Sequence, residues 1–263
     1  MGKEMIGELE LNRIYHRDCI EGMRLLPDKS IDMILCDLPY GTTRNKWDTV
    51  IPFESLWEQY ERVIKSNGAI VLTAQDKFTA KLVLSNEKRH RYNLIWHKSR
   101  PTGFLNANRM PLRDHEDICV FYKKLPTYNP QFFEGKPNHV KDGALAKKNR
   151  NNNYGDFDPV EQKTTNRKYP RSVLKFDAYD PTKLQHPTQK PVELFSYLIR
   201  TFTNEGEIIL DNCMGSGTTA VAALQLNRNF IGFETEPEYV QIANQRLEAI
   251  ERGSALKEAS HDE

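Results

Sequence analysis

Two short stretches of the chain, about 170 residues apart, hold the side chains best suited to chemistry. The first, residues 37–40, reads Asp-Leu-Pro-Tyr and follows the apolar run 31–36. Asp37 and a backbone carbonyl fixed by Pro39 can accept both N–H groups of an exocyclic amine, which makes its nitrogen more nucleophilic. Tyr40 can stack on a base extruded from a duplex. We therefore expect a catalytic set of Asp37, Leu38, Pro39 and Tyr40, although an ordinary proline turn would look the same over four residues.

The second stretch, residues 211–219, carries a glycine turn between a strand and a helix. Asp211 follows the apolar run 208–210, Gly215 and Gly217 flank a serine, and the pattern of 219–224 is helical. Glycines let a backbone approach a ligand closely, and an acid closing the next strand can accept from ribose hydroxyls. Glu234 is placed for that role, although alone it also fits a solvated strand end. Together these features predict an adenosine-bearing cofactor.

A third stretch, residues 186–191, reads His-Pro-Thr-Gln-Lys-Pro directly before an expected helix. Thr188 is suited to the N-cap and Pro191 to the first helical turn. Capping explains the Thr and the prolines but leaves Gln189 and Lys190 unexplained. We expect Lys190 and the surrounding backbone to hold an anionic carboxylate of the cofactor, which a helix start also attracts.

Apolar periodicity predicts alternating strands and helices on either side of an irregular segment. We expect one α/β domain with a mostly parallel sheet covered by helices. Strands are expected at 13–16, 31–36, 69–72, 92–97, 117–122, 208–210 and 230–234, and helices at 19–26, 51–64, 75–84, 192–203, 219–224 and 238–250. The expected organisation is a catalytic half at 1–125, an insertion at 126–184, a cofactor half at 185–252 and a frayed tail at 253–263.

The expected insertion is rich in proline and polar residues and has a modest basic surplus. Residues 126–185 carry eleven Lys or Arg against seven Asp or Glu, whereas the whole chain has a formal charge of +1. Such a segment suits phosphate contacts, although a solvated loop would have the same composition. We expect it to bind DNA through six basic side chains: Lys147, Lys148, Arg150, Arg167, Lys168 and Arg171.

The spacing of the cysteines and the length of the apolar stretches limit the classes of protein to which the chain can belong. Four cysteines are widely spaced without a Cys-x-x-Cys pair, which disfavours a zinc knuckle and a disulfide framework and favours a reducing compartment. No stretch approaches 18 apolar residues. We therefore expect a soluble cytoplasmic protein that binds neither a membrane nor a metal.

These motifs, in this order, resemble the β group of S-adenosylmethionine-dependent DNA amino-methyltransferases. The matching segments are Asp18-Cys19, 37–40, Trp96-His97-Lys98, His115-Glu116, 186–191, 211–219 and Phe233-Glu234. The resemblance implies a Rossmann-like methyltransferase fold with a seven-stranded, mostly parallel sheet, one antiparallel strand and helices on both faces. It also implies methylation of adenine N6 in DNA, and it makes a homodimer plausible.

The resemblance also assigns the cofactor contacts. It implies that Asp18 binds the adenine edge of S-adenosylmethionine, Glu234 its ribose, and the Gly215 loop with Lys190 its methionyl end. The full expected cofactor set is Asp18, Cys19, Asp37, Thr188, Gln189, Lys190, Asp211, Gly215, Ser216, Gly217, Thr218, Thr219 and Glu234. Two positions depart from the family pattern: Leu38 replaces a proline, and Asn212-Cys213 replaces Pro-Phe.

Three alternatives remain open. Cytosine N4 is a second target for the same family, although an Asp at position 37 favours adenine. An NAD-dependent oxidoreductase would share a glycine turn, but it would carry Gly-x-Gly-x-x-Gly near its N-terminus, and position 220 here is Ala. A nucleic-acid-binding protein without catalysis is the third, and the intact Asp37, Pro39, Tyr40 and Lys190 disfavour it.

Overall fold

A computed structural model describes residues 4–43, 45, 48–138, 161, 163–177 and 189–259. The chain divides into two compact units, one formed by Met1–Asn129 with Ser172–Glu263 and the other by Pro130–Arg171. The larger unit carries the main sheet and all the described helices. Within the described ranges, no helix is both long enough and apolar enough to cross a membrane.

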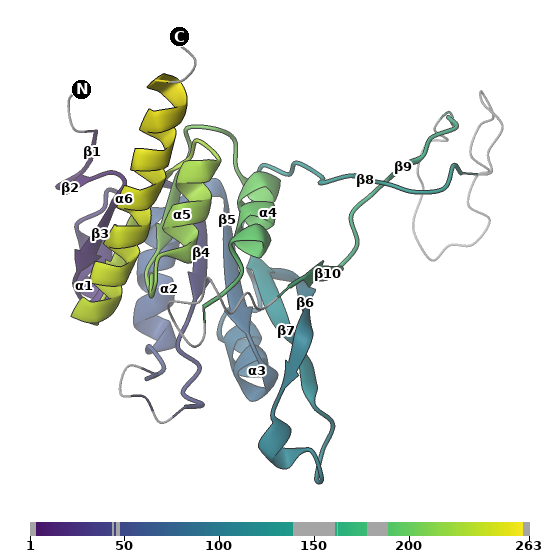
Figure 1. Cartoon of the computed structure of the whole chain (residues 1–263). Coiled ribbons are helices and arrows are strands. Elements are labelled where there is room, and N and C mark those ends of the chain that lie inside the picture. Colours follow the sequence, from purple (N-terminus) through teal and green to yellow (C-terminus); the bar gives the residue numbers. More distant parts are fainter. Residues whose placement is uncertain are drawn as a thin grey trace. The chain divides into compact units, whose positions relative to one another are not determined.

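The larger unit alternates strands and helices along most of its length (Figure 1). Its strands are β1 (Met5–Ile6), β2 (Leu9–Glu10), β3 (Arg13–His16), β4 (Ile31–Asp37), β5 (Ile64–Ala74), β6 (His90–Thr102), β7 (Arg113–Phe121), β10 (Val173–Phe176), β11 (Ile208–Asp211) and β12 (Asn229–Glu234). Its helices are α1 (Cys19–Arg24), α2 (Phe53–Val63), α3 (Asp76–Ser85), the short 3-10 helix η1 (Phe104–Asn106), α4 (Val192–Phe202), α5 (Thr218–Gln225) and α6 (Pro237–Ala259).

The main sheet has eight strands in the order β10-β6-β7-β5-β4-β11-β12-β3. Only β7 runs antiparallel to its neighbours β5 and β6, so the prediction of one reversed strand is confirmed. The expected count of seven strands was wrong, because β10 adds an eighth strand beside β6. Its four residues lie in the segment expected to be irregular, and so short a run gives little periodicity against the surrounding prolines.

Helices cover both faces of the sheet, as its alternating apolar residues require. Along β4, Ile34 and Cys36 pack into one core cluster with α1, α2 and α3. Met33 and Leu35 point to the opposite face and pack with α4, α5 and α6, the helices in front of the sheet in Figure 1. Two apolar layers therefore hold the central strands β4 and β11 rigidly, and these strands end at the acids of both motifs.

The order of the strands creates a crevice at the centre of the sheet. Strand β4 connects through α2 to β5 on one side, whereas β11 connects through α5 to β12 on the other. Because β4 and β11 are parallel neighbours, Asp37 and Asp211 end adjacent strands at the same edge. Ligands of open α/β sheets bind at such a switch point.

Two boundaries of helices differ from the sequence-based expectation. Helix α6 runs to Ala259, so the tail expected to fray from residue 253 is helical over most of its length; Lys257, Glu258 and Ala259 are good helix formers. Pro191 is the N-cap of α4 in an extended conformation and does not lie in the first turn. Thr188, the expected N-cap, lies outside the described residues.

The smaller unit holds a two-stranded antiparallel ladder, β8 (Phe133–Glu134) with β9 (Arg167–Lys168). The rings of Phe132 and Tyr169 lie 4.8 Å apart, and the guanidinium of Arg167 lies 3.8 Å from the centre of the Phe132 ring. This unit spans less than the expected insertion 126–184, because residues on both sides of it belong to the larger unit. Aromatic and basic side chains thus pack together beside the ladder.

Candidate active site

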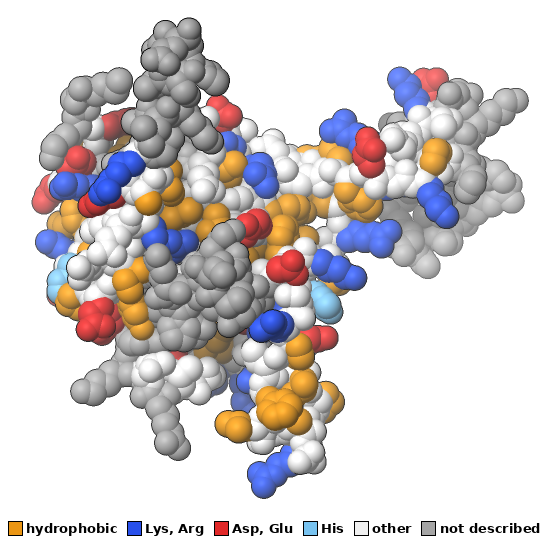
Figure 2. Space-filling model, viewed as in Figure 1, with side chains coloured by type: hydrophobic (Ala, Val, Ile, Leu, Met, Phe, Trp, Pro, Cys, Tyr) orange, Lys and Arg blue, Asp and Glu red, His pale blue; other side chains and the backbone are white. Residues whose placement is uncertain are grey.

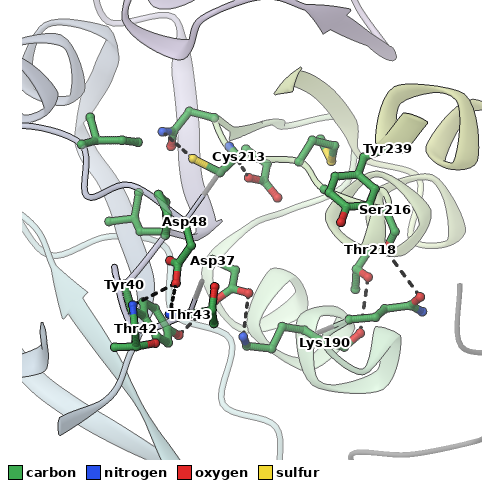
Figure 3. A pocket seen from close by; sticks show the side chains of 18 of the residues that line it. Asp37, Tyr40, Thr42, Thr43, Asp48, Lys190, Cys213, Ser216, Thr218 and Tyr239 are labelled. Carbon is green, nitrogen blue, oxygen red and sulfur yellow. Dashed lines mark hydrogen bonds and ion pairs between the residues drawn. The ribbon is translucent and has the colours of Figure 1, made fainter. Parts of the chain in front are cut away.

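A single cavity of about 950 Å³ opens at the switch point of the larger unit. Its lining includes residues from the ends of β4, β11 and β12, the start of α1, and the segment before α4. Figure 3 shows Asp37, Tyr40 and Lys190 on one side of this cavity and Ser216 and Thr218 of the glycine turn on another. Both motifs separated by about 170 residues in the sequence therefore open onto the same space.

The carboxylate of Asp37 accepts hydrogen bonds from three side chains. Lys190 Nζ lies 2.6 Å from Oδ2, and the Tyr40 hydroxyl lies 2.9 Å from Oδ1. The hydroxyl of Thr73, on the neighbouring strand β5, also donates to Oδ1. These bonds fix the orientation of the carboxylate while its side chain stays 27% exposed toward the cavity.

Lys190 belongs to a buried row of alternating charges. Its Nζ lies 3.3 Å from Glu116 Oε2, and Lys98 Nζ lies 2.9 Å from Glu116 Oε1. Burial alone would lower the pKa of Lys190, but the charges of Asp37 and Glu116 outweigh it and raise that pKa above its usual value. Burial likewise opposes the ionised form of Glu116, yet Lys190 and Lys98 together lower its pKa. The charged forms of Lys190 and Glu116 are therefore both favoured despite their burial.

The loop after Tyr40 is held by Asp48, a residue that the sequence analysis missed. Asp48 Oδ1 accepts from the backbone N–H of Gly41 at 2.8 Å, and Oδ2 accepts from Thr42 at 2.9 Å and Thr43 at 2.6 Å. Burial works against ionisation of Asp48, but these backbone donors lower its pKa. An acid a few residues beyond a Gly-Thr-Thr turn was the available signal, since such a side chain can cap consecutive amides.

The glycine turn exposes its backbone to the cavity. Gly215 has a φ of +53° and nothing within 4 Å of where a Cβ would stand, whereas a Cβ on Gly217 would lie 2.8 Å from that of Ala243 on α6. Gly215 thus leaves its face open to a ligand, and Gly217 lets α6 pack against the turn. Gly217 is not part of the cavity lining.

Glu234, at the end of β12, organises this turn. Its Oε2 accepts from the backbone N–H of Gly215 at 2.6 Å, and its Oε1 accepts from Thr235 at 2.8 Å and Glu236 at 2.9 Å. The side chain still lines the cavity. Glu234 therefore connects two strand ends in addition to facing the ligand space, which the sequence analysis did not anticipate.

Asp18 and the segment before α4 border the same cavity. Asp18 is the N-cap of α1, and its Oδ1 accepts from the backbone of Ile20 at 2.9 Å and Glu21 at 3.1 Å. Gln189 Oε1 accepts from the Ser216 hydroxyl at 3.4 Å, and the carbonyl of Lys190 accepts from the Thr218 hydroxyl at 3.3 Å. The 189–190 segment is therefore docked on the glycine turn.

Asp211 is the most deeply buried acid of the cavity, at 3% exposure. Its Oδ1 accepts from the backbone N–H of Cys213 at 3.0 Å, and its Oδ2 accepts from the Thr219 hydroxyl. Burial raises the pKa of Asp211 to about 7, because the two hydrogen bonds only partly offset the loss of water. This carboxyl consequently changes charge near neutral pH.

The cavity brings together most of the predicted residues. Those that line it are Asp18, Cys19, Asp37, Leu38, Pro39, Tyr40, Gln189, Lys190, Asp211, Gly215, Ser216, Thr218, Thr219 and Glu234. Lys147, Lys148, Arg150 and Thr188 lie outside the described residues. Arg167, Lys168 and Arg171 belong to the smaller unit. Lys190 is paired with carboxylates of the protein itself, so its role at the methionyl end stays a prediction.

A comparison with known families identifies the class of this site. The family model described as DNA methylase matches residues 31–245, a span that contains Asp37, Lys190, the glycine turn and Glu234. The chain belongs to the DNA methylase family. Among the described residues of this DNA methylase, no group of three or more His, Cys, Asp or Glu side chains could hold a metal ion.

Curated relatives and a solved structure resemble this DNA methylase over nearly its whole length. It is 32% identical to the type II methyltransferase M.BglII of Bacillus subtilis, over 90% of this chain and 69% of the relative. It is 26% identical to the DNA adenine methyltransferase YhdJ of Escherichia coli strain K12, over 94% of this chain and 86% of the relative. The crystal structure of the M1.HpyAVI–SAM complex matches with a TM-score of 0.58 and 28% identity, over 89% of this chain and 98% of that one.

Proposed function

We propose that this DNA methylase transfers a methyl group from S-adenosylmethionine to the N6 amine of adenine in a specific DNA sequence. The observation that carries the proposal is the convergence of Asp37 and Tyr40 with the glycine turn and Glu234 on one cavity. A site for amine activation and a site for an adenosine-bearing ligand thus share one space. The adenine methyltransferase among the relatives supports the choice of base.

The residues present fit S-adenosylmethionine. The cavity is within the usual range of ligand sites, and its lining includes the acids Asp18, Asp37, Asp211 and Glu234, which suit a sulfonium cation. We propose that Glu234 accepts from the ribose, that Asp18 with Cys19 borders the adenine, and that the open backbone at Gly215 lies along the methionyl end. When bound, this cofactor supplies an electrophilic methyl group.

We propose that Asp37 activates and orients the amine. An ionised carboxylate has about four sites for hydrogen-bond donors. Lys190, Tyr40 and Thr73 use three of them, which leaves one for an N–H of the adenine amine. A backbone carbonyl next to Pro39 accepts the second N–H, and the ammonium of Lys190 holds the carboxylate of Asp37 in place. The base must leave the duplex to reach this position, so the reaction requires base flipping.

Single-molecule sequencing of DNA from a methylation-free host tests this proposal. Cells expressing the chain should carry modified adenine in one sequence context, and cells expressing Asp37→Ala should carry none. Modified cytosine in place of adenine would favour the N4 alternative. DNA without any modification, from cells that contain the folded protein, would contradict the proposed function.

A further inference from the structure

The β6–β7 hairpin carries a strongly exposed apolar tip. Phe104 is 80% exposed, Leu105 99% and Met110 55%. Figure 2 shows hydrophobic side chains gathered over the lower end of the hairpin, which extends below α3 in Figure 1. Large apolar side chains that are exposed next to one another typically mark a surface that binds a partner.

The backbone of the tip is held by its own hydrogen bonds. Gly103 enters the turn with a φ of +89°, and its carbonyl accepts from Asn106 at 2.9 Å. The carbonyl of Phe104 accepts from Ala107 at 3.0 Å. Phe104 and Leu105 are therefore presented outward by a structured turn.

The charge around the tip identifies the kind of partner. Residues 99–113 contain Arg100, Arg109 and Arg113 and no Asp or Glu. Arg113 pairs with Asp76, at the start of α3, at 2.6 Å, which ties the base of the hairpin to that helix. An apolar tip between arginines complements a nucleic-acid duplex, whose backbone is anionic and whose stacked bases are apolar.

The hairpin is continuous with the cavity. Arg100, Pro101, Thr102 and Arg113 line the same space as Asp37 and Tyr40. Leu105 follows Thr102 by three residues, a backbone reach of at most about 11 Å. A duplex that presents a base to Asp37 must therefore come close to the tip.

We propose that Phe104 and Leu105 form a wedge that enters the base stack and fills the space left by the extruded adenine. This inference rests on the proposed function, because only base extrusion leaves such a space. Apolar side chains are inserted in this way by proteins that unstack DNA, and the arginines hold the adjacent phosphates. The wedge stabilises the open duplex while the base is in the cavity.

A first experiment measures methyl transfer with the full chain and duplex DNA from a methylation-free host. The double variant Phe104→Ala/Leu105→Ala should lower the single-turnover rate at least tenfold while the dissociation constant for S-adenosylmethionine changes less than twofold. Leu84→Ala removes a leucine that is 67% exposed on α3 and should stay within twofold of wild type in both measurements. A double variant within twofold of the wild-type rate would overturn the wedge.

A second experiment does not depend on methyl transfer. Random-sequence duplexes with and without one abasic site are compared as ligands, because an abasic site is a space already open in the stack. Wild type should bind the abasic duplex at least fivefold more tightly, and the double variant should lose that preference. No preference in wild type, or one retained in the variant, would overturn the wedge.

Two further outcomes separate the wedge from other accounts. Sedimentation of wild type and the double variant should give the same mass; a dimer that the substitutions dissociate would make the tip a self-association surface and overturn the proposal. Wild-type protein that prefers the abasic duplex but methylates no DNA would contradict the proposed function while supporting insertion by the tip.

Discussion

Asp37 is the residue on which activation of the amine depends most directly. The interaction of Asp37 with the reacting nitrogen strengthens as the nitrogen becomes positively charged. Asp37 therefore stabilises the transition state more than the bound substrate. Asp37→Ala should therefore leave binding of S-adenosylmethionine nearly intact while single-turnover methyl transfer falls by several orders of magnitude. In Asp37→Asn, which keeps the shape of the side chain without its charge, the rate of methyl transfer should fall almost as far. A variant that retained more than a tenth of wild-type transfer would contradict the assigned role.

Asp211 predicts a pH dependence of stability. Burial raises its pKa from an ordinary 3.8 to about 7, so between these values the folded protein binds more protons than the unfolded chain. The free energy of unfolding should therefore fall as pH rises through this window. Asp211→Asn cannot titrate, so its stability relative to wild type should rise by on the order of 1 to 3 kcal/mol between pH 5 and pH 8. Urea unfolding of both proteins across this pH range measures the difference in their free energies of unfolding. A difference that stays constant with pH would refute the prediction.

At the scale of elements, Glu234 joins the end of β12 to the glycine turn. Glu234→Ala removes the proposed acceptor for ribose and also the partner of the Gly215 backbone. The dissociation constant for S-adenosylmethionine should rise tenfold to a hundredfold, about 1.4 to 2.7 kcal/mol. Glu238→Ala, in the first turn of α6 and outside the cavity lining, is the matched control. Titration calorimetry decides the matter: equal affinities for the two folded variants would remove Glu234 from the cofactor site.

The ladder of the smaller unit carries basic side chains that we expect to contact DNA. Lys168 and Arg171 are the better pair to neutralise, because Arg167 lies only 3.8 Å from the centre of the Phe132 ring, whereas Arg171 makes a longer contact of 5.8 Å with the Phe133 ring. If both contact phosphates, Lys168→Gln/Arg171→Gln should lower the log–log salt slope of DNA binding by about 0.9 per contact. Lys88→Gln/Lys123→Gln neutralises two exposed lysines elsewhere and should leave the slope unchanged. Matching slopes for both double variants would mean that this ladder does not bind DNA.

The strands and helices that hold the site were largely predictable from the sequence. Several side chains that position the site residues were not. Buried strands ending in Asp37 and Asp211 follow from local apolar runs, and parallel topology brings such ends to one edge. Thr73 gave no signal in the sequence, and Asp48 gave only the weak one of an acid beyond a Gly-Thr-Thr turn. Thr73 reaches Asp37 only through the pairing of β4 with β5, and Asp48 binds backbone amides that any sequence would supply. Contacts of this kind depend on the folded geometry.

Across the whole molecule, two segments of the chain form one compact catalytic unit, and a separate ladder is inserted in the sequence between β7 and β10. The expected division at 126–184 was too wide because β10 returns to the main sheet, and its four residues stand among prolines that hide their periodicity. The catalytic and cofactor motifs, although separated by this insertion, share one unit. Formation of a homodimer and the assignment of the basic residues to DNA stay predictions.

The identity of the methylated nucleoside shows whether this chain methylates adenine N6. Purified full-length protein is incubated with S-adenosylmethionine carrying a deuterated methyl group and with DNA from a methylation-free host, and the digested nucleosides are analysed by mass spectrometry. The proposed activity predicts trideuterated N6-methyldeoxyadenosine with wild type and none with Asp37→Ala. Label found only in N4-methyldeoxycytidine, or in no nucleoside while the protein binds the cofactor, would contradict it.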